Sequence, residues 1–198
     1  GRMMHKHPHS SLLRASVTAL ALCAPACVQA AVQEEHAERK YAVQAEPNQS
    51  LREALNAATP ILINGKRFHG YTRWYVRWQF QWAPDPQGRC RITQVNTRLT
   101  TEVQLPDLRR GTEAQQARFD RYLPALSQHE QGHVQVGRDA AQAIDRAIAD
   151  MPAASDCATL ERNANILGQA LLQEHVEREK QFDVTTGHGA TQGARLDD

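Results

Sequence analysis

The feature that most constrains the fold is a strict alternation of residue types in the segment RWYVRWQFQW, residues 73–82. A large apolar side chain occupies every second position, and mostly polar side chains occupy the positions between. A period of two residues indicates a β-strand with one buried face. The buried face is predicted to consist of Trp74, Val76, Trp78, Phe80 and Trp82.

A second long strand is predicted directly after the first. The turn sequence APDPQG ends the alternating segment, and CRITQVNTRLTTEVQLP, residues 90–106, is rich in threonine and valine. So short a connection favours antiparallel pairing of the two strands. Upstream, the pair Asn64-Gly65 between apolar residues predicts a smaller hairpin.

The residues before these strands carry weaker signals. Residues 31–50 are polar, and we expect them to be loosely ordered apart from a short strand at YAVQA. Ser50 followed three residues later by Glu53 is a capping-box pattern, which predicts a short helix that ends before Pro60.

After Pro106 the sequence becomes helical. Residues 111–152 form one long helical stretch in which Thr112 and Gln115 make a second capping-box pattern. Pro124 lies inside it and predicts either a kinked helix or two helices. A last helix is expected over residues 157–183. The predicted class is therefore α+β, with an antiparallel sheet from the first half packed on the two long helices.

The first 30 residues are set apart by their composition. A two-residue remnant and a basic segment precede the apolar run ASVTALALCAPACV, and small residues follow. This order predicts a secretory signal peptide cleaved near Ala30, too short to span a bilayer as a mature helix. Residues 31–198 would then form a single domain of a secreted, periplasmic protein without a membrane span.

Charge and cysteine content further restrict the class of protein to which this chain can belong. A formal net charge of +1, with no basic stripe, argues against nucleic acid as a partner. Cys23 and Cys27 belong to the predicted signal peptide, which leaves Cys90 and Cys157. An even pair of cysteines in an exported protein predicts a disulfide bond.

The segment HEQGH, residues 129–133, gives the main functional hypothesis. His129 and His133 lie four residues apart, so both imidazoles face the same side of a helix and can reach one metal ion. Two imidazoles suit Zn²⁺, and Glu130 stands where its carboxylate can take a proton from a zinc-bound water. The pattern also arises by chance in solvated helices. Here apolar residues on both sides predict a buried helix, in which charged side chains need a partner such as a metal.

The third ligand is left open by the sequence. His188, between two glycines, is the leading candidate, and Asp183 lies five residues before it. The remaining candidates lie on the last helix, and they are Glu174, His175 and Glu177. Near the predicted hairpin, His69 or Tyr71 are candidates for stabilising an oxyanion, although packing explains Tyr71 equally well.

Three segments together are similar to a known family. HEQGHVQVGRDAA, the helix from Cys157 and QFDVTTGHGATQGA resemble the bacterial domain-of-unknown-function family nine-two-two, over roughly residues 40–195. Its members are described as predicted secreted zinc-dependent proteases of the zincin group. In this chain Phe182 replaces an expected tyrosine, and Gly187 replaces an acidic residue. The resemblance implies a zincin-like fold with His129, His133 and His188 as ligands.

The sequence therefore predicts an exported metalloprotease. Zn²⁺ would activate a water, Glu130 would act as the general base, and the substrate would be a peptide or protein. The alternative is a non-catalytic zinc-binding or protein-interaction module on the same fold, and a closed site with four protein ligands would favour it.

Overall fold

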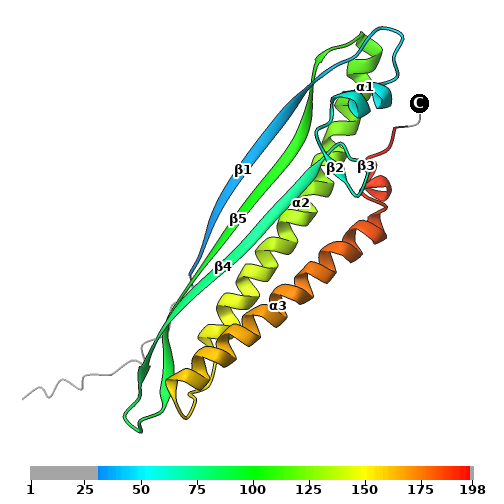
Figure 1. Ribbon diagram of the computed structural model, residues 1–198. Helices are drawn as coiled ribbons and strands as arrows, with labels where there is room; N and C mark the ends of the chain where they lie inside the picture. The colour runs from blue at the N-terminus through cyan, green and yellow to red at the C-terminus, as the bar shows by residue number, and fades with distance from the viewer. Residues whose placement is uncertain (1–30, 197–198) are drawn as a thin grey trace, which may run out of the picture.

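A computed structural model describes residues 31–196 of the chain. It has two layers, a three-stranded sheet and two long helices that lie along one face of that sheet (Figure 1). The predicted signal peptide falls outside the described residues, so its cleavage stays a prediction. Within residues 31–196, the structure contains no helix that is long and apolar enough to span a membrane.

The sheet is mixed, with the strand order β1-β5-β4. Strands β4 (Tyr71–Pro84) and β5 (Cys90–Arg110) pair antiparallel, which confirms the prediction for the two long strands. Strand β1 (Ala31–Gln44) pairs parallel with β5 along its whole length. The prediction of an entirely antiparallel sheet was therefore wrong at this edge.

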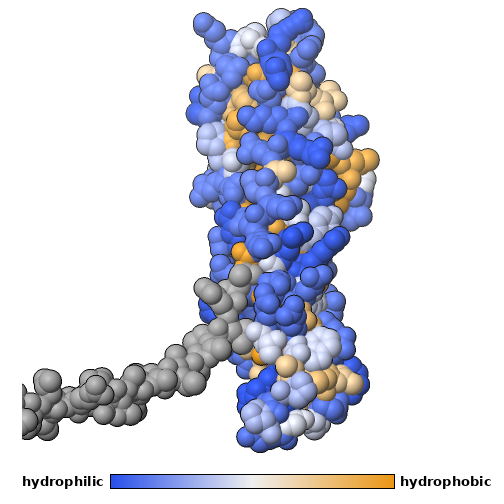
Figure 2. Space-filling model, turned by 90° about the vertical axis from the view of Figure 1, so that its left-hand side faces the viewer, coloured by the Kyte–Doolittle hydropathy of each residue, from blue (hydrophilic) through white to orange (hydrophobic). Residues whose placement is uncertain are grey.

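Strand β1 also corrects the expectation that residues 31–50 are loosely ordered. Its residues 32–40 are exposed, so no alternation of apolar side chains marked it. Its hydrogen bonds to β5 satisfy the backbone, and within residues 32–44 only Tyr41 and Val43 bury their side chains. Seen from the β1 side, the surface is mostly hydrophilic (Figure 2). A strand held by backbone pairing leaves little trace in the side-chain pattern.

The predicted buried face of β4 is confirmed over most of its length. Val76 is buried and the rings of Trp74, Trp78 and Phe80 are partly buried against the helices. Trp82, near the end of β4, is 37% exposed, and the register of β4 and β5 shifts between Gln81 and Trp82.

The first long helix, α2 (Glu113–Ala149), is a single helix that passes through Pro124. Pro124 cannot donate a hydrogen bond to the carbonyl of Asp120. Both residues lie on the exposed side of the helix, where water can replace the lost bond. The alternative of two separate helices was therefore wrong. The predicted capping box is present, with Thr112 and Gln115 bonded reciprocally.

The second long helix, α3 (Cys157–Thr186), packs beside α2 and under β4. It ends at Gly187, whose φ of 55° lies in the left-handed region typical of helix C-termini. A short 3-10 helix, η1 (Ala190–Gln192), follows. The predicted disulfide is confirmed: Cys90 at the start of β5 is bonded to Cys157 at the start of α3.

The smaller elements lie at the opposite end from the disulfide. Helix α1 (Leu51–Ala58) begins at Ser50, whose side chain accepts from the backbone N–H of Glu53 as predicted. Strands β2 (Leu62–Ile63) and β3 (Lys66–Arg67) form the predicted hairpin. Its turn places Asn64 and Gly65 at positive φ, as Asn-Gly hairpins require.

The core is divided into two clusters. The α1-end core includes Tyr41, Leu55, Val103, Phe119 and Leu126. The disulfide-end core includes Cys90, Val95, Leu99, Ile144 and Leu160. The candidate site lies between β4, α2 and α3, close to the α1-end core.

Two helix glycines explain how closely the layers approach. A Cβ added at Gly137 of α2 would meet Cγ of Trp74 at 2.8 Å, and one at Gly168 of α3 would meet Trp78 at 2.7 Å. A glycine inside a helix costs about 1 kcal/mol relative to alanine. Here that cost is offset because the two tryptophan rings of β4 lie directly on the helix backbones.

Candidate metal centre

The HEQGH segment occupies the middle of α2, on the side that faces β4 and α3. His129, Glu130 and His133 are 3%, 4% and 6% exposed. The helical spacing places both histidine rings on one face, as predicted, and their centroids are 4.9 Å apart. Three ionisable side chains are thus buried together, which requires compensating partners.

Asp183, near the end of α3, completes a group of three potential ligands with the two histidines. The Nε2 atoms of His129 and His133 are 3.3 Å apart, and Oδ1 of Asp183 lies 3.0 Å and 2.8 Å from them. Two nitrogens bound tetrahedrally to one zinc ion at about 2.0–2.1 Å would be about 3.3 Å apart. The spacing of the two imidazoles therefore fits zinc.

The hydrogen bonds on the other side of each ring favour the same conclusion. Nδ1 of His129 lies 2.8 Å from Oε1 of Gln192, and Nδ1 of His133 lies 3.1 Å from Oε1 of Glu179. Both oxygens are acceptors, so each neutral ring carries its proton on Nδ1. Both Nε2 lone pairs then point toward the carboxylate oxygen of Asp183. Three acceptors that converge in this way need a proton or a metal ion between them, and two imidazoles with a carboxylate are donors that zinc takes.

The pKa shifts of the group also indicate that a positive charge is favourable there. Burial alone would lower the pKa of His133, but hydrogen bonds to Asp183 and Glu179 raise it to about 9. Burial likewise opposes the charge of Asp183, yet the bonds from His129 and His133 hold the pKa of this carboxyl well below its ordinary value. In the protein alone, a proton on His133 supplies the charge that a metal ion would supply.

Glu130 lies beside this group and is held by β4. Thr72 donates from Oγ1 to Oε2 of Glu130 at 2.5 Å. A Cβ at Gly70 would lie 3.0 Å from Oε1 of Glu130, so any larger residue at position 70 would crowd this carboxylate. Burial raises the pKa of Glu130 above its ordinary value, against the opposing effect of the Thr72 bond. A buried carboxylate of raised pKa is suited to accept and return a proton.

Phe182 packs against both histidines of the group. Its ring is stacked on His129, with centroids 4.9 Å apart, and meets His133 edge-on at 5.0 Å. A Cβ at Gly132 would lie 2.3 Å from the Phe182 ring. Gly132, the fourth residue of HEQGH, therefore leaves the space in which this ring orients the two imidazoles.

His188, the leading candidate for the third ligand, lies beside the group of three. Its side chain is 57% exposed, and its Nδ1 is 3.6 Å from Oδ1 of Asp183. Its φ of 54° is in the left-handed region, and its ring lies 5.1 Å from that of Phe68. The structure thus brings Asp183, the candidate ranked lower by sequence, into the group and places His188 at its edge.

The candidates on the earlier part of α3 lie elsewhere. Glu174 forms an ion pair with Arg178, and Glu177 forms one with Lys180. His175 is buried and donates from Nδ1 to the carbonyl of Leu171. It lines a separate groove between α2 and α3. None of these three residues belongs to the group around Asp183.

Three residues of the site were not predicted from the sequence, namely Glu179, Thr72 and Gln192. A signal existed for Glu179, because it lies four residues before Asp183 and therefore on the same face of α3. Thr72 and Gln192 reach the site only through contacts with residues 58 and 63 positions away. No local pattern could have identified them.

A cleft of about 740 Å³ opens over the group. Its lining includes Glu130, Asp183, His188 and the first five residues of β4. Both proposed oxyanion residues also line it. His69 is bonded through both ring nitrogens, to Tyr122 and to Asn56, and Tyr71 packs against the α1-end core. A cleft of this size can hold a segment of peptide.

Fold and site together describe an α+β protein with a candidate metal centre between its sheet and two helices. A family model described as "Bacterial protein of unknown function (DUF922)" matches residues 38–189, and the chain belongs to this family. The match spans every residue of the group of three. Comparison with curated proteins and with solved structures gave no match.

Proposed function

We propose that this protein is a zinc-dependent peptidase that acts outside the cytoplasm. The observation that carries the proposal is the convergence of His129, His133 and Asp183, with the buried carboxylate of Glu130 beside them. A purely structural cluster needs no further buried carboxylate in the lining of a cleft. Hydrolysis needs one, because a proton must be removed from the attacking water.

Each protein group has a separate task in this mechanism. Zinc, when bound, supplies a Lewis acid that polarises the scissile carbonyl and lowers the pKa of water. Glu130 accepts the proton of the attacking water and returns it to the leaving amine. Thr72 holds Oε2 of this carboxylate, and Oε1 accepts no hydrogen bond from the residues at positions 31–196, so it is available to the substrate side. The raised pKa of Glu130 makes it a better base than an exposed carboxylate.

The sheet offers a way to bind the peptide. Strand β4 is at the edge of the order β1-β5-β4, and residues Tyr71 to Tyr75 line the cleft. An extended peptide can add to such an edge through backbone hydrogen bonds, with little dependence on its side chains. Strand addition at β4 would bring a scissile bond beside Glu130.

The disulfide supports the proposed compartment. Cys90 and Cys157 are bonded, and such bonds persist mainly in oxidising environments. Together with the predicted signal peptide, this supports action outside the cytoplasm.

The proposal is tested by replacing Glu130 with glutamine in the full chain. Glu130→Gln should retain zinc, measured by elemental analysis, and lose at least about 100-fold in hydrolysis of a fluorescent casein substrate. Gln131→Ala, an exposed neighbour, is the matched control and should keep both properties. Hydrolysis at the wild-type rate by Glu130→Gln would remove Glu130 from the mechanism.

A second candidate function is a non-catalytic zinc-binding module, and the position of His188 favours it. Its Nδ1 is 3.6 Å from Asp183, so a rotation of the side chain would bring a fourth ligand to the group. A site closed by four protein ligands is typical of structural zinc. Loss of zinc from His188→Ala, with no hydrolysis by the wild type, would establish this alternative.

A further inference from the structure

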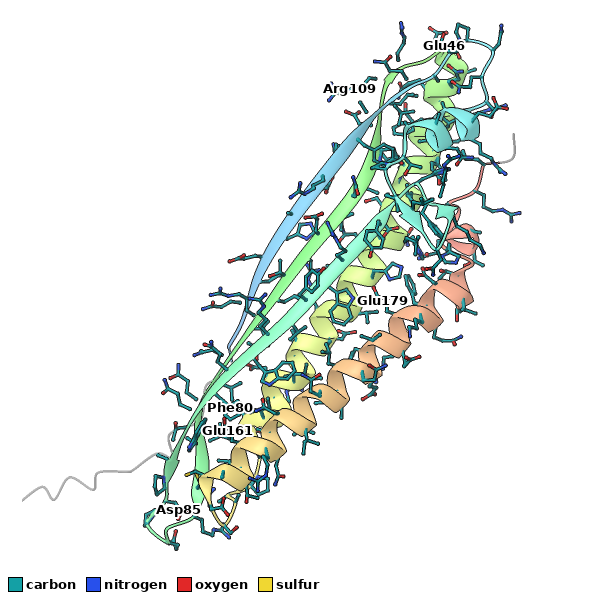
Figure 3. The ribbon with its side chains drawn as sticks, in the orientation of Figure 1. Glu46, Phe80, Asp85, Arg109, Glu161 and Glu179 are labelled. Atoms are coloured by element: carbon teal, nitrogen blue, oxygen red, sulfur yellow. A yellow bond between two sulfur atoms is a disulfide. The ribbon has the colours of Figure 1, made fainter. Side chains whose placement is uncertain are left out.

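We propose that Glu179 is a positioning residue, which holds His133 in its metal-binding tautomer and is itself held by Trp74. This inference rests on the metal site of the proposed function and adds to it a residue that supports a ligand. Glu179 lies on α3, and its side chain is on the side of this helix that faces α2 (Figure 3).

The geometry joins three elements at one carboxylate oxygen. Oε1 of Glu179 accepts from Nδ1 of His133 on α2 at 3.1 Å and from Nε1 of Trp74 on β4 at 3.1 Å. An indole N–H can only donate, so the oxygen between the two nitrogens must act as an acceptor for both. Because Trp74 lies against the backbone at Gly137, its N–H occupies a fixed place from which to hold Glu179.

The chemical consequence concerns the proton on His133. A neutral imidazole carries its proton on either nitrogen, and only an unprotonated nitrogen binds a metal. The bond to Glu179 keeps the proton on Nδ1 and leaves the lone pair of Nε2 facing Asp183, 2.8 Å away. A carboxylate behind a histidine ligand also makes the ring a stronger donor, and its loss typically weakens metal binding 10- to 100-fold.

The two histidines are supported differently. The partner of His129 is the neutral amide of Gln192, at 2.8 Å, whereas the partner of His133 is a carboxylate. A charged acceptor forms the stronger hydrogen bond. Removal of Glu179 is therefore expected to weaken zinc binding more than removal of Gln192.

The experiment measures zinc affinity directly, by competition with a chromophoric chelator, in the full chain. Glu179→Ala should raise the dissociation constant about 10- to 100-fold, and Glu179→Gln about 10-fold. Trp74→Phe, which keeps an aromatic ring but removes the indole N–H, should raise it a few-fold. Glu177→Gln is the matched control, because Glu177 is exposed on the same helix, and it should leave the affinity unchanged.

A second readout separates positioning from a general loss of stability. In zinc-loaded wild type, nitrogen–proton NMR correlations should show a slowly exchanging Nδ1–H on His133. That signal should disappear in Glu179→Ala and persist in Glu177→Gln. If Glu179→Ala does not give a cooperative thermal transition, Glu179→Gln and Trp74→Phe decide the question by the same two measurements.

The outcomes distinguish this inference from the proposed function. If the wild type binds zinc and the three variants bind it within two-fold of wild type, Glu179 is not a positioning residue. If the variants weaken zinc binding as expected but no peptide is hydrolysed, the inference stands and the peptidase proposal fails. If the wild type binds no zinc, both are wrong.

Discussion

The two ends of the helical layer are held together in different ways. At the disulfide end, the Cys90–Cys157 bond and an apolar cluster that includes Leu99 and Ile144 join β5, α2 and α3. At the site end, buried polar contacts also join the same two helices and β4. They run through His133, Glu179 and Trp74.

From this difference we expect the disulfide end to be stable on its own and the site end to depend on a bound metal. Apolar burial and a covalent bond need nothing further, whereas three converging acceptors and a buried Glu130 are costly without a cation. The disulfide end is therefore expected to act as a fixed base that positions the site. The site end is expected to be fully ordered only when the metal is bound.

The largest effect is expected at the disulfide end. Replacing both Cys90 and Cys157 with serine releases a loop spanning 67 residues, which should lower the free energy of unfolding by about 4 kcal/mol. Urea denaturation of the zinc-loaded protein measures this loss. Zinc affinity should stay within about two-fold of wild type, and a large loss of affinity would show that the two ends are not independent.

Removal of the metal should have the next largest effect, and it should be confined to the site end. At free zinc about 100-fold above its dissociation constant, binding stabilises the protein by about 2.7 kcal/mol. A chelator should remove this stability. Hydrogen exchange should increase around His129, His133 and Asp183 but not around Cys157. A uniform increase along α2 and α3 would contradict the division into two ends.

Adding a single methyl group at the site should have an intermediate effect on the free energy of unfolding. In Gly132→Ala the new Cβ would occupy the space of the Phe182 ring, so we expect a loss of about 1–3 kcal/mol together with weaker zinc binding. Gln131→Ala, at the exposed neighbouring position, should show neither effect. Unchanged zinc affinity in Gly132→Ala would mean that Phe182 does not orient the histidines.

The smallest effect is a pH dependence at the site end, measured on the metal-free protein. Burial, and to a smaller extent Arg52, lower the pKa of His69 from 6.5 to about 4. As the pH falls from 6.5 to about 4, the unfolded chain takes up a proton that the folded chain does not, so stability is lost over this window. We expect a loss of about 1–2 kcal/mol after screening by solvent. His69→Gln should lack it, and the control His36→Gln on β1 should keep it.

Much of the fold could be predicted because its signals are local. The alternation around Trp78, the turn before Cys90 and the caps at Ser50 and Thr112 each depend on a few neighbouring residues. The pairing of β1 was missed because its first residues bury no apolar face. Its parallel partner lies about 65 residues away along the chain.

The residues of the site also differ in whether a local pattern could predict them. His129, Glu130 and His133 share one helix, so their spacing alone placed them together. Asp183 and Glu179 reach them only because α3 packs beside α2 at a particular depth, which no local pattern specifies. His188 was favoured for its place on a flexible sequence between glycines. The fold puts the helical carboxylate nearer to the two imidazoles.

The central claim is that His129, His133 and Asp183 form a zinc site. The most direct test is the zinc content of purified full chain, compared between wild type, Asp183→Asn and His188→Ala. We predict about one zinc per chain in the wild type and in His188→Ala, and far less in Asp183→Asn. Wild-type protein without zinc, or Asp183→Asn with a full equivalent of it, would contradict the account.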